Sequence, residues 1–144
     1  MKTAALVLLA FSLCLASSSG QELQVDSLGY ETFEMTEGDT TYVMKKYFMA
    51  FLKKGPNRTQ SPEETEEIQR GHLAYMNELA ETGQLNIAGP FGGSGDGEMQ
   101  GVVIYNVPTL EIATQLVSND PAVQAGRLII EVLPWWAAKG STLE

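Results

Sequence analysis

The sequence contains only one cysteine, Cys14, and only one long apolar run, which surrounds it. The run extends over thirteen residues from Ala4 to Ala16, whereas a membrane-spanning helix needs about 20. Lys2 precedes the run and Ser17-Ser18-Ser19-Gly20 follows it, an arrangement typical of a secretory signal peptide. We therefore expect an exported chain, periplasmic or extracellular, with no membrane span and no disulfide after cleavage.

Basic residues and histidine are also scarce. Lys and Arg number 9 against 18 Asp and Glu, which gives a net charge of −9. Phosphate backbones and anionic lipids repel such a chain, so we expect neither nucleic acid nor a membrane as a partner. Histidine occurs once, as His72. Without cysteine in the mature chain, a zinc site would need carboxylates at most positions, and we expect no metal and no other cofactor.

The sequence divides into three predicted parts. Residues 1–20 form the signal peptide, and a lipid anchor on Cys14 is disfavoured because Leu13 is larger than the small residue usual before a lipidated cysteine. The remaining 124 residues suffice for one domain. Residues 21–41 are acidic without sustained periodicity, and we interpret them as an N-terminal extension to a domain over residues 42–144.

A helix is predicted from about Pro62 to Thr82. Ser61-Pro62-Glu63-Glu64 supplies an N-cap serine, a proline at the first helical position and a glutamate three residues after the cap. Gly83 suits the left-handed conformation that ends helices. At about 100° per residue, one face carries an apolar stripe with the histidine near its centre: Ile68, His72, Tyr75, Met76 and Leu79.

A histidine on an apolar helix face needs hydrogen-bond partners, because an unpaired buried polar group costs about 1–3 kcal/mol. His72 is therefore either a satisfied core residue or a residue that faces a pocket. Gly71 beside it costs about 1 kcal/mol in a helix interior, which indicates close approach of a neighbouring strand or a ligand. Packing is the simpler explanation for Gly71.

The remaining pattern is a split βαβ repeat. Strands are predicted over residues 42–52, 84–88, 101–106 and 127–133, and a second helix over residues 109–118. The order strand, helix, strand, strand, helix, strand predicts an α+β fold, a ferredoxin-like βαββαβ sandwich with both helices on one face of the sheet. Aromatic and apolar side chains of the first strand alternate faces, so we expect a homodimer to cover the open face.

Six segments in this order resemble the YCII-related family, whose members are dimeric α+β barrel proteins similar in fold to muconolactone isomerase. The resemblance covers roughly Lys46 to Trp136. The segments are Leu52-Lys53-Lys54-Gly55-Pro56, Arg70-Gly71-His72-Leu73, Leu79-Ala80-Glu81-Thr82-Gly83, Ala88-Gly89-Pro90-Phe91, Asn119-Asp120-Pro121-Ala122-Val123 and Glu131-Val132-Leu133-Pro134-Trp135.

The resemblance implies a catalytic pair of His72 and Asp120 and acid/base chemistry, of the lyase or isomerase type, on a small and often aromatic compound. A carboxylate suits this role because it fixes the tautomer of an imidazole and raises its basicity. Asp120 before Pro121 also matches a residue that caps the backbone of Ala122 and Val123. The capping role and the pairing with His72 are compatible.

Four further residues are candidates for binding the small molecule. Gly89 and Pro90 end a predicted strand where a ligand would enter, and Phe91 would wall the pocket, although Gly-Pro is equally an ordinary strand stop. Arg127 is placed to hold a substrate carboxylate, although an arginine at a strand start is usually solvated or paired with an acid.

The leading interpretation is an exported, homodimeric, cofactor-free enzyme that acts on a small aromatic or keto compound, with His72 as general acid or base and Asp120 orienting it. Two alternatives stay open. One is a binding module that holds a small molecule without converting it. The other is a structural dimer in which His72 is a satisfied core residue.

Overall fold

A computed structural model describes residues 21–92 and 97–143, so the predicted signal peptide lies outside the described residues. Within these residues the elements follow one another in this order: β1 (Gln24–Val25), β2 (Glu31–Glu37), β3 (Thr40–Lys54), α1 (Pro62–Glu81), β4 (Leu85–Pro90), β5 (Met99–Tyr105), α2 (Leu110–Ser118), α3 (Pro121–Gln124) and β6 (Leu128–Ala138). None of the helices in these ranges is long and apolar enough to cross a membrane.

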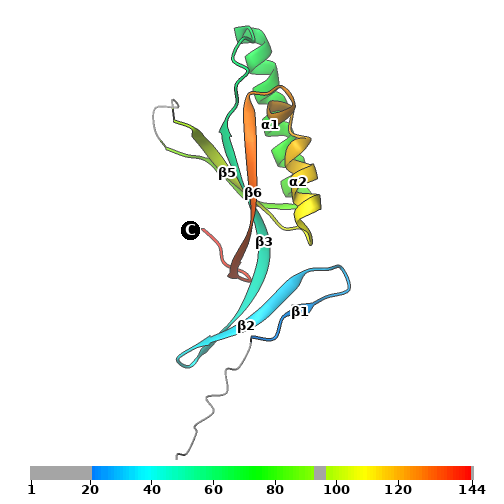
Figure 1. The fold of residues 1–144 in the computed structure, drawn as a ribbon, viewed down its shortest axis with the longest axis vertical. Coiled ribbons are helices and arrows are strands. Elements are labelled where there is room, and N and C mark those ends of the chain that lie inside the picture. The colour runs from blue at the N-terminus through cyan, green and yellow to red at the C-terminus, as the bar shows by residue number, and fades with distance from the viewer. Residues whose placement is uncertain (1–20, 93–96, 144) are drawn as a thin grey trace, which may run out of the picture.

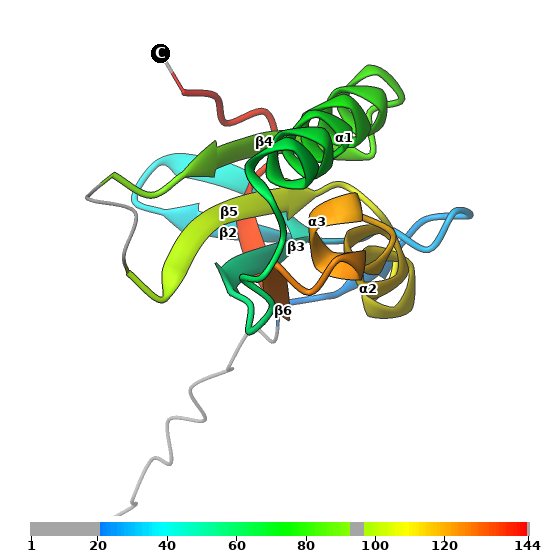
Figure 2. The same cartoon turned by 90° about the horizontal axis from the view of Figure 1, so that it is seen from above.

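Strand β3 is the centre of the sheet. It pairs antiparallel with β6 and with β5, and β5 pairs antiparallel with β4 on its other side. The resulting order β6-β3-β5-β4 is that of a ferredoxin-like fold, with α1 and α2 on one side of the sheet (Figures 1 and 2). The predicted α+β architecture is therefore confirmed.

Alternation along β3 separates the helix side of the sheet from the open side. Phe48, Ala50 and Leu52 are buried in the hydrophobic core. Their neighbours Met49 and Phe51 point to the opposite face, because successive strand residues alternate. Helix residues and the loop between β5 and α2 complete this core through Met76, Leu79, Val107, Ala113 and Val117.

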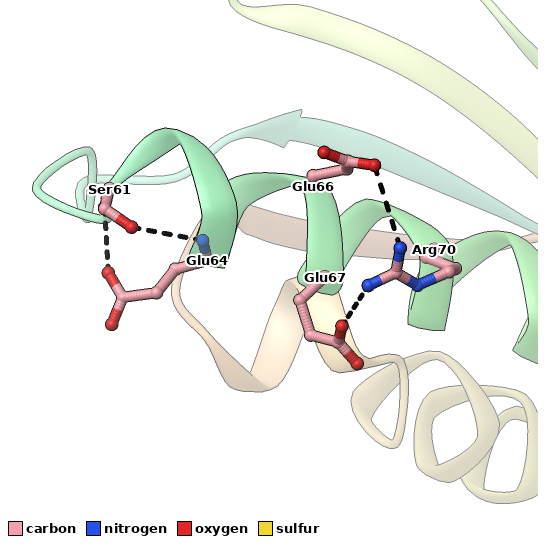
Figure 3. A network of polar contacts seen from close by, with 5 residues as sticks. All are labelled: Ser61, Glu64, Glu66, Glu67 and Arg70. Atoms are coloured by element: carbon pink, nitrogen blue, oxygen red, sulfur yellow. Dashed lines mark hydrogen bonds and ion pairs between the residues drawn. The ribbon is translucent and has the colours of Figure 1, made fainter.

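Helix α1 begins and ends as the sequence predicts. The Ser61 side chain accepts a hydrogen bond from the Glu64 backbone, and the Glu64 side chain accepts one from the Ser61 backbone (Figure 3). Gly83 follows the last turn with a φ of 74°, which a residue with a Cβ adopts only at a cost. A cap of the Ser61 kind stabilises a helix by about 1 kcal/mol.

Residues of the predicted extension contribute strands to the sheet. Residues Glu31–Glu37 form β2, which pairs antiparallel with the first part of β3, and β1 pairs with β2. Figure 1 shows this pair projecting beyond the helix-covered part of the sheet. Phe33 packs against Trp136 with ring centroids 4.9 Å apart. Alternation of Phe33 and Met35 with polar residues was the signal for this strand.

The last strand is longer than predicted and is preceded by a short helix that the sequence analysis lacks. Strand β6 continues through Pro134 to Ala138, and it pairs with β3 alone. An edge strand tolerates proline, because the missing N–H falls where no partner strand needs it. Helix α3, one turn long, lies between α2 and β6 in the sequence and contacts α1, α2 and β6.

Two polar contacts join Asn106, which follows β5, to Tyr30 of the extension and to Lys45 of β3. The Tyr30 hydroxyl donates to the Asn106 carbonyl at 3.2 Å, and the Lys45 ammonium donates to the Asn106 side-chain oxygen at 2.7 Å. The Lys45 ammonium also lies 4.1 Å from the Tyr30 ring centroid. Burial, followed by the nearby charge of Lys139, lowers the pKa of Lys45 from its usual value.

Tyr105 provides a test of the core through the pH dependence of stability. Its side chain is fully buried, and its hydroxyl has no hydrogen-bond partner among residues 21–92 and 97–143. Burial, followed by the charge of Asp120, raises the pKa of this hydroxyl above its usual value. Ionisation of Tyr105 is therefore less favourable in the folded state than in the unfolded state. The stability that the protonated hydroxyl contributes is complete below the unfolded pKa of about 10 and is lost as the pH rises above it.

We expect Tyr105→Phe to stabilise the fold by about 1 kcal/mol at neutral pH, because an unpaired buried hydroxyl is removed. The same variant should lose less stability between neutral pH and about pH 11 than the wild type does. Denaturant unfolding at both pH values measures each effect. Tyr42→Phe, at a residue 40% exposed, is the control. Equal alkaline losses in wild type and Tyr105→Phe would contradict the prediction.

Candidate functional site

A cavity of about 480 Å³ lies between α1 and strands β4 and β5. This volume falls within the range of small-molecule sites. Helix α1 contributes one wall through Ile68, Gln69, His72, Leu73, Met76 and Asn77. The strands and the segments around them contribute the rest through Leu52, Arg58, Ala88, Gly89, Pro90, Gln100, Gly101, Val102, Val103, Ala122, Arg127 and Leu128.

His72 and Asp120 are in direct contact at this cavity. Nδ1 of His72 lies 2.6 Å from Oδ2 of Asp120. The His72 side chain is 14% exposed and the Asp120 side chain is 0% exposed. The structure thus brings together the two residues that the sequence analysis pairs, one at the cavity wall and one behind it.

Asp120 has two different partners, one for each carboxylate oxygen. Oδ1 accepts a hydrogen bond from the Ala122 backbone N–H at 2.8 Å, at the start of α3. Oδ2 faces His72. The capping contact and the histidine contact therefore coexist, and the cap fixes the orientation of the carboxylate toward the imidazole.

Close packing of α1 on α3 sets the distance between the pair. A Cβ added to Gly71 would lie 3.3 Å from Cγ of Pro121, which is tighter than an ordinary contact. Gly71 precedes His72, and Pro121 follows Asp120. The absence of a side chain at Gly71 therefore lets the backbone segments that carry His72 and Asp120 approach each other. Gly71 thus serves packing, but the neighbour is helix α3 and not the predicted strand.

The contact determines which nitrogen of His72 is available. In the neutral imidazole one ring nitrogen carries the proton and the other accepts. The Asp120 carboxylate accepts at Nδ1, so Nδ1 carries the proton and Nε2 keeps its lone pair. Nε2 has no hydrogen-bond partner within the described part of the chain. In this tautomer Nε2 can accept a proton or a hydrogen bond.

Two tyrosines near Asp120 remain protonated. Tyr75 donates its hydroxyl to the Leu116 carbonyl at 2.9 Å. Burial, followed by the charge of Asp120, raises the pKa of Tyr75 above its usual value. The same two causes act on Tyr105. These hydroxyls therefore stay neutral near neutral pH. The Asp120 carboxylate contacts His72 and the backbone of α3 instead.

The structure places three of the four predicted binding residues at the cavity. Gly89, Pro90 and Arg127 line it. Phe91 does not line it and is 47% exposed. Pro90 ends β4, and side chains of successive extended residues point to opposite sides, so Phe91 faces away from the wall that Pro90 forms. The prediction that Phe91 walls the pocket is corrected.

Several polar lining residues escaped the sequence analysis. Arg58 lies in the segment between β3 and α1, and Gln100 lies on β5. Gln69 and Asn77 sit on α1 beside the apolar stripe rather than within it, eight residues apart and so on neighbouring parts of one helix face. That spacing was the available signal. No group of three or more His, Cys, Asp or Glu residues that would hold a metal occurs among the described residues.

The comparisons with known proteins identify a family. The model of the YCII-related domain matches residues 46–136, more than half of the chain. A similar solved structure is the 5-chloro-2-hydroxyhydroquinone dehydrochlorinase from Burkholderia phenoliruptrix AC1100 in complex with 2,5-dihydroxybenzoquinone. It is 22% identical, the match covers 62% of this chain and 92% of that chain, and the TM-score is 0.46. No curated protein matches the chain.

The tautomer of His72 tests the geometry of the pair. In Asp120→Asn the oxygen of the amide is required by the Ala122 N–H, so the amide NH₂ faces Nδ1 and turns it into an acceptor. We expect ¹⁵N NMR of the neutral ring to show the proton on Nδ1 in the wild type and on Nε2 in the variant. The signals are unambiguous because the chain has one histidine.

Glu111→Gln is the control for this experiment, because Glu111 is an exposed acid in the first turn of α2. It should leave the wild-type tautomer unchanged. A proton on Nε2 in the wild type, or no change of tautomer in Asp120→Asn, would show that Asp120 does not orient the imidazole.

Proposed function

The chain belongs to the YCII-related domain family, and on this basis we propose that it is an acid/base enzyme, of the lyase or isomerase type, that converts a small aromatic or keto compound. His72 removes a proton from the compound and Asp120 orients His72. The single observation that carries this proposal is the 2.6 Å contact between Nδ1 and Asp120, in a histidine that lines the cavity and whose Nε2 stays free of this contact.

The proposed reaction uses one proton carrier. Nε2 takes a proton from a carbon next to a carbonyl, or from a hydroxyl, and the electron pair of the broken bond moves into the compound. The imidazolium formed is stabilised by the adjacent carboxylate. Return of the proton to a different atom completes an isomerisation, and loss of a leaving group with its electron pair completes an elimination.

The test is turnover of a panel of small hydroxy-aromatic and keto compounds, followed by mass spectrometry. His72→Asn keeps an N–H donor toward Asp120 but removes Nε2, so we expect kcat/KM to fall by about 10²-fold or more. Asp120→Asn should also lower the rate, because the wrong tautomer results. Arg70→Gln, at an exposed arginine of α1, should leave the rate unchanged.

Unchanged turnover in His72→Asn would contradict the acid/base proposal. The binding module makes a different prediction: a compound of the panel raises the melting temperature and is recovered unchanged. The structural dimer predicts that no compound binds and that His72→Asn changes stability alone.

We also propose that a second copy of the chain covers the open face of the sheet. Ile129, Leu133 and Trp135 lie on the face of β6 away from the helices, and each is at least 39% exposed. Exposed apolar residues gathered on one face are typical of a protein interface.

Leu133→Glu should therefore convert a dimer into a monomer, because it places an unpaired charge in the interface. Analytical ultracentrifugation measures the state. Ile112→Glu, on the helix side and 37% exposed, should leave the dimer intact. A monomeric wild type would refute this part of the proposal.

Export is the remaining part of the proposal. The apolar run after Lys2 and the small residues before Gln21 support it. Mass spectrometry of the protein recovered from outside the cytoplasm checks it, with a chain that starts at Gln21 as the expected result.

A further inference from the structure

The charge of the cavity is opposite to that of the chain. The sequence carries 18 acidic residues and a net charge of −9. The cavity is lined by Arg58, Arg127 and His72, and no Asp or Glu occurs among its lining residues in the described part of the chain. Two of the three arginines in the sequence therefore line one cavity, and none of the described Asp and Glu side chains lines it.

The guanidinium of Arg127 is held in place without being neutralised. Nη1 donates to the Gln60 side-chain oxygen at 3.0 Å and to the Thr65 hydroxyl at 3.3 Å. Both acceptors are uncharged, and no carboxylate within residues 21–92 and 97–143 forms an ion pair with Arg127. The sequence left open that Arg127 pairs with an acid, and none of the described acids forms such a pair.

Arg70, which does not line the cavity, is paired with acids and so differs from Arg127. It lies on the exposed side of α1 between the carboxylates of Glu66 and Glu67 (Figure 3). Lys46 and Lys53 are likewise paired, with Glu31 and Glu131. Ion pairs with acids are thus common for the basic residues that the structure describes, whereas none of the described acids pairs with Arg127.

Arg58 and Arg127 are held on adjacent backbone segments. The Gly55 N–H donates to the Arg127 carbonyl at 2.8 Å, and the Asn57 N–H donates to the Gly126 carbonyl at 3.1 Å. A Cβ on Gly55 would lie 2.2 Å from the Gly126 carbonyl oxygen, so the two segments are in tight contact. Arg58 is exposed and Arg127 is partly buried, which places one charge at the rim and one in the wall.

We propose that the small molecule bound in this cavity is an organic anion, with a carboxylate that Arg127 binds and that Arg58 attracts at the rim. An arginine binds a carboxylate through two parallel N–H donors, and a partly buried site strengthens such a contact. This inference rests on the proposed function in one respect, which is that the reacting atom of the bound molecule lies beside Nε2 of His72. The anion preference itself is a binding property.

The experiment compares benzoate with benzamide, which has the same ring and no charge. The full-length mature protein is titrated with each, and the ring resonances of His72 report occupancy of the cavity. In the wild type, benzoate should bind at least about tenfold more tightly than benzamide. Arg127→Gln should abolish most of this preference, Arg58→Gln should reduce it less, and Arg70→Gln should preserve it.

If Arg127→Gln fails to fold, Arg127→Lys replaces it in the experiment. Arg127→Lys retains the charge without the forked geometry, so it should keep part of the preference for benzoate. The wild-type comparison needs no variant at all. Equal affinity for the two compounds, or no response of His72 to benzoate, would overturn the proposal. An equal loss of preference in Arg70→Gln would overturn the assignment to Arg127.

The outcomes separate this inference from the proposed reaction. Preferential binding of benzoate supports the inference even if no compound is turned over. Missing turnover would count only against the proposed acid/base reaction. Turnover of uncharged compounds without any preference for anions would overturn the inference and leave the acid/base reaction standing.

Discussion

The close approach of α1 to α3 is the constraint on which the site depends. Gly71 lies against Pro121, and their neighbours His72 and Asp120 meet at 2.6 Å as a result. A side chain at position 71 would require Pro121 to move by a few tenths of an ångström, and Pro121 lies between Asp120 and the Ala122 N–H that is bonded to the same carboxylate. Helix packing, the helix cap and the histidine contact are therefore one unit.

Electrostatics divides the molecule into two regions. Carboxylates dominate the outside, where they pair with Lys46, Lys53 and Arg70. The cavity wall carries positive or titratable groups, and the Asp120 carboxylate behind it is completely buried and bonded through both oxygens. A buried charge needs such partners, because removing it from water is costly. The negative charge is consequently directed at His72 rather than at a ligand.

Local sequence signals predicted the elements that depend on local chemistry. The Ser61 cap and Gly83 define α1 within a residue at each end. The order of strands and helices predicts the sheet topology, since short connections and right-handed crossovers leave few arrangements. The contact between His72 and Asp120 followed from the family resemblance, because residues 48 positions apart have no local signal of contact.

The features that sequence analysis missed depend on tertiary context. Strand β2 is stable because it pairs with β3, and β6 passes through Pro134 because it is an edge strand. Phe91 follows the last residue of β4, so its direction depends on where that strand ends. Arg58 reaches the cavity because the Gly55 segment lies against Gly126, a contact between distant parts of the chain.

The proposed reaction depends on the exchange of a proton between Nε2 of His72 and a bound small molecule. Transfer of solvent deuterium into a bound keto acid, followed by NMR in D₂O, measures that exchange directly. We expect deuterium at the carbon next to the carbonyl with the wild type and none above background with His72→Asn. Equal incorporation by both proteins, or no incorporation into any bound keto acid, would contradict it.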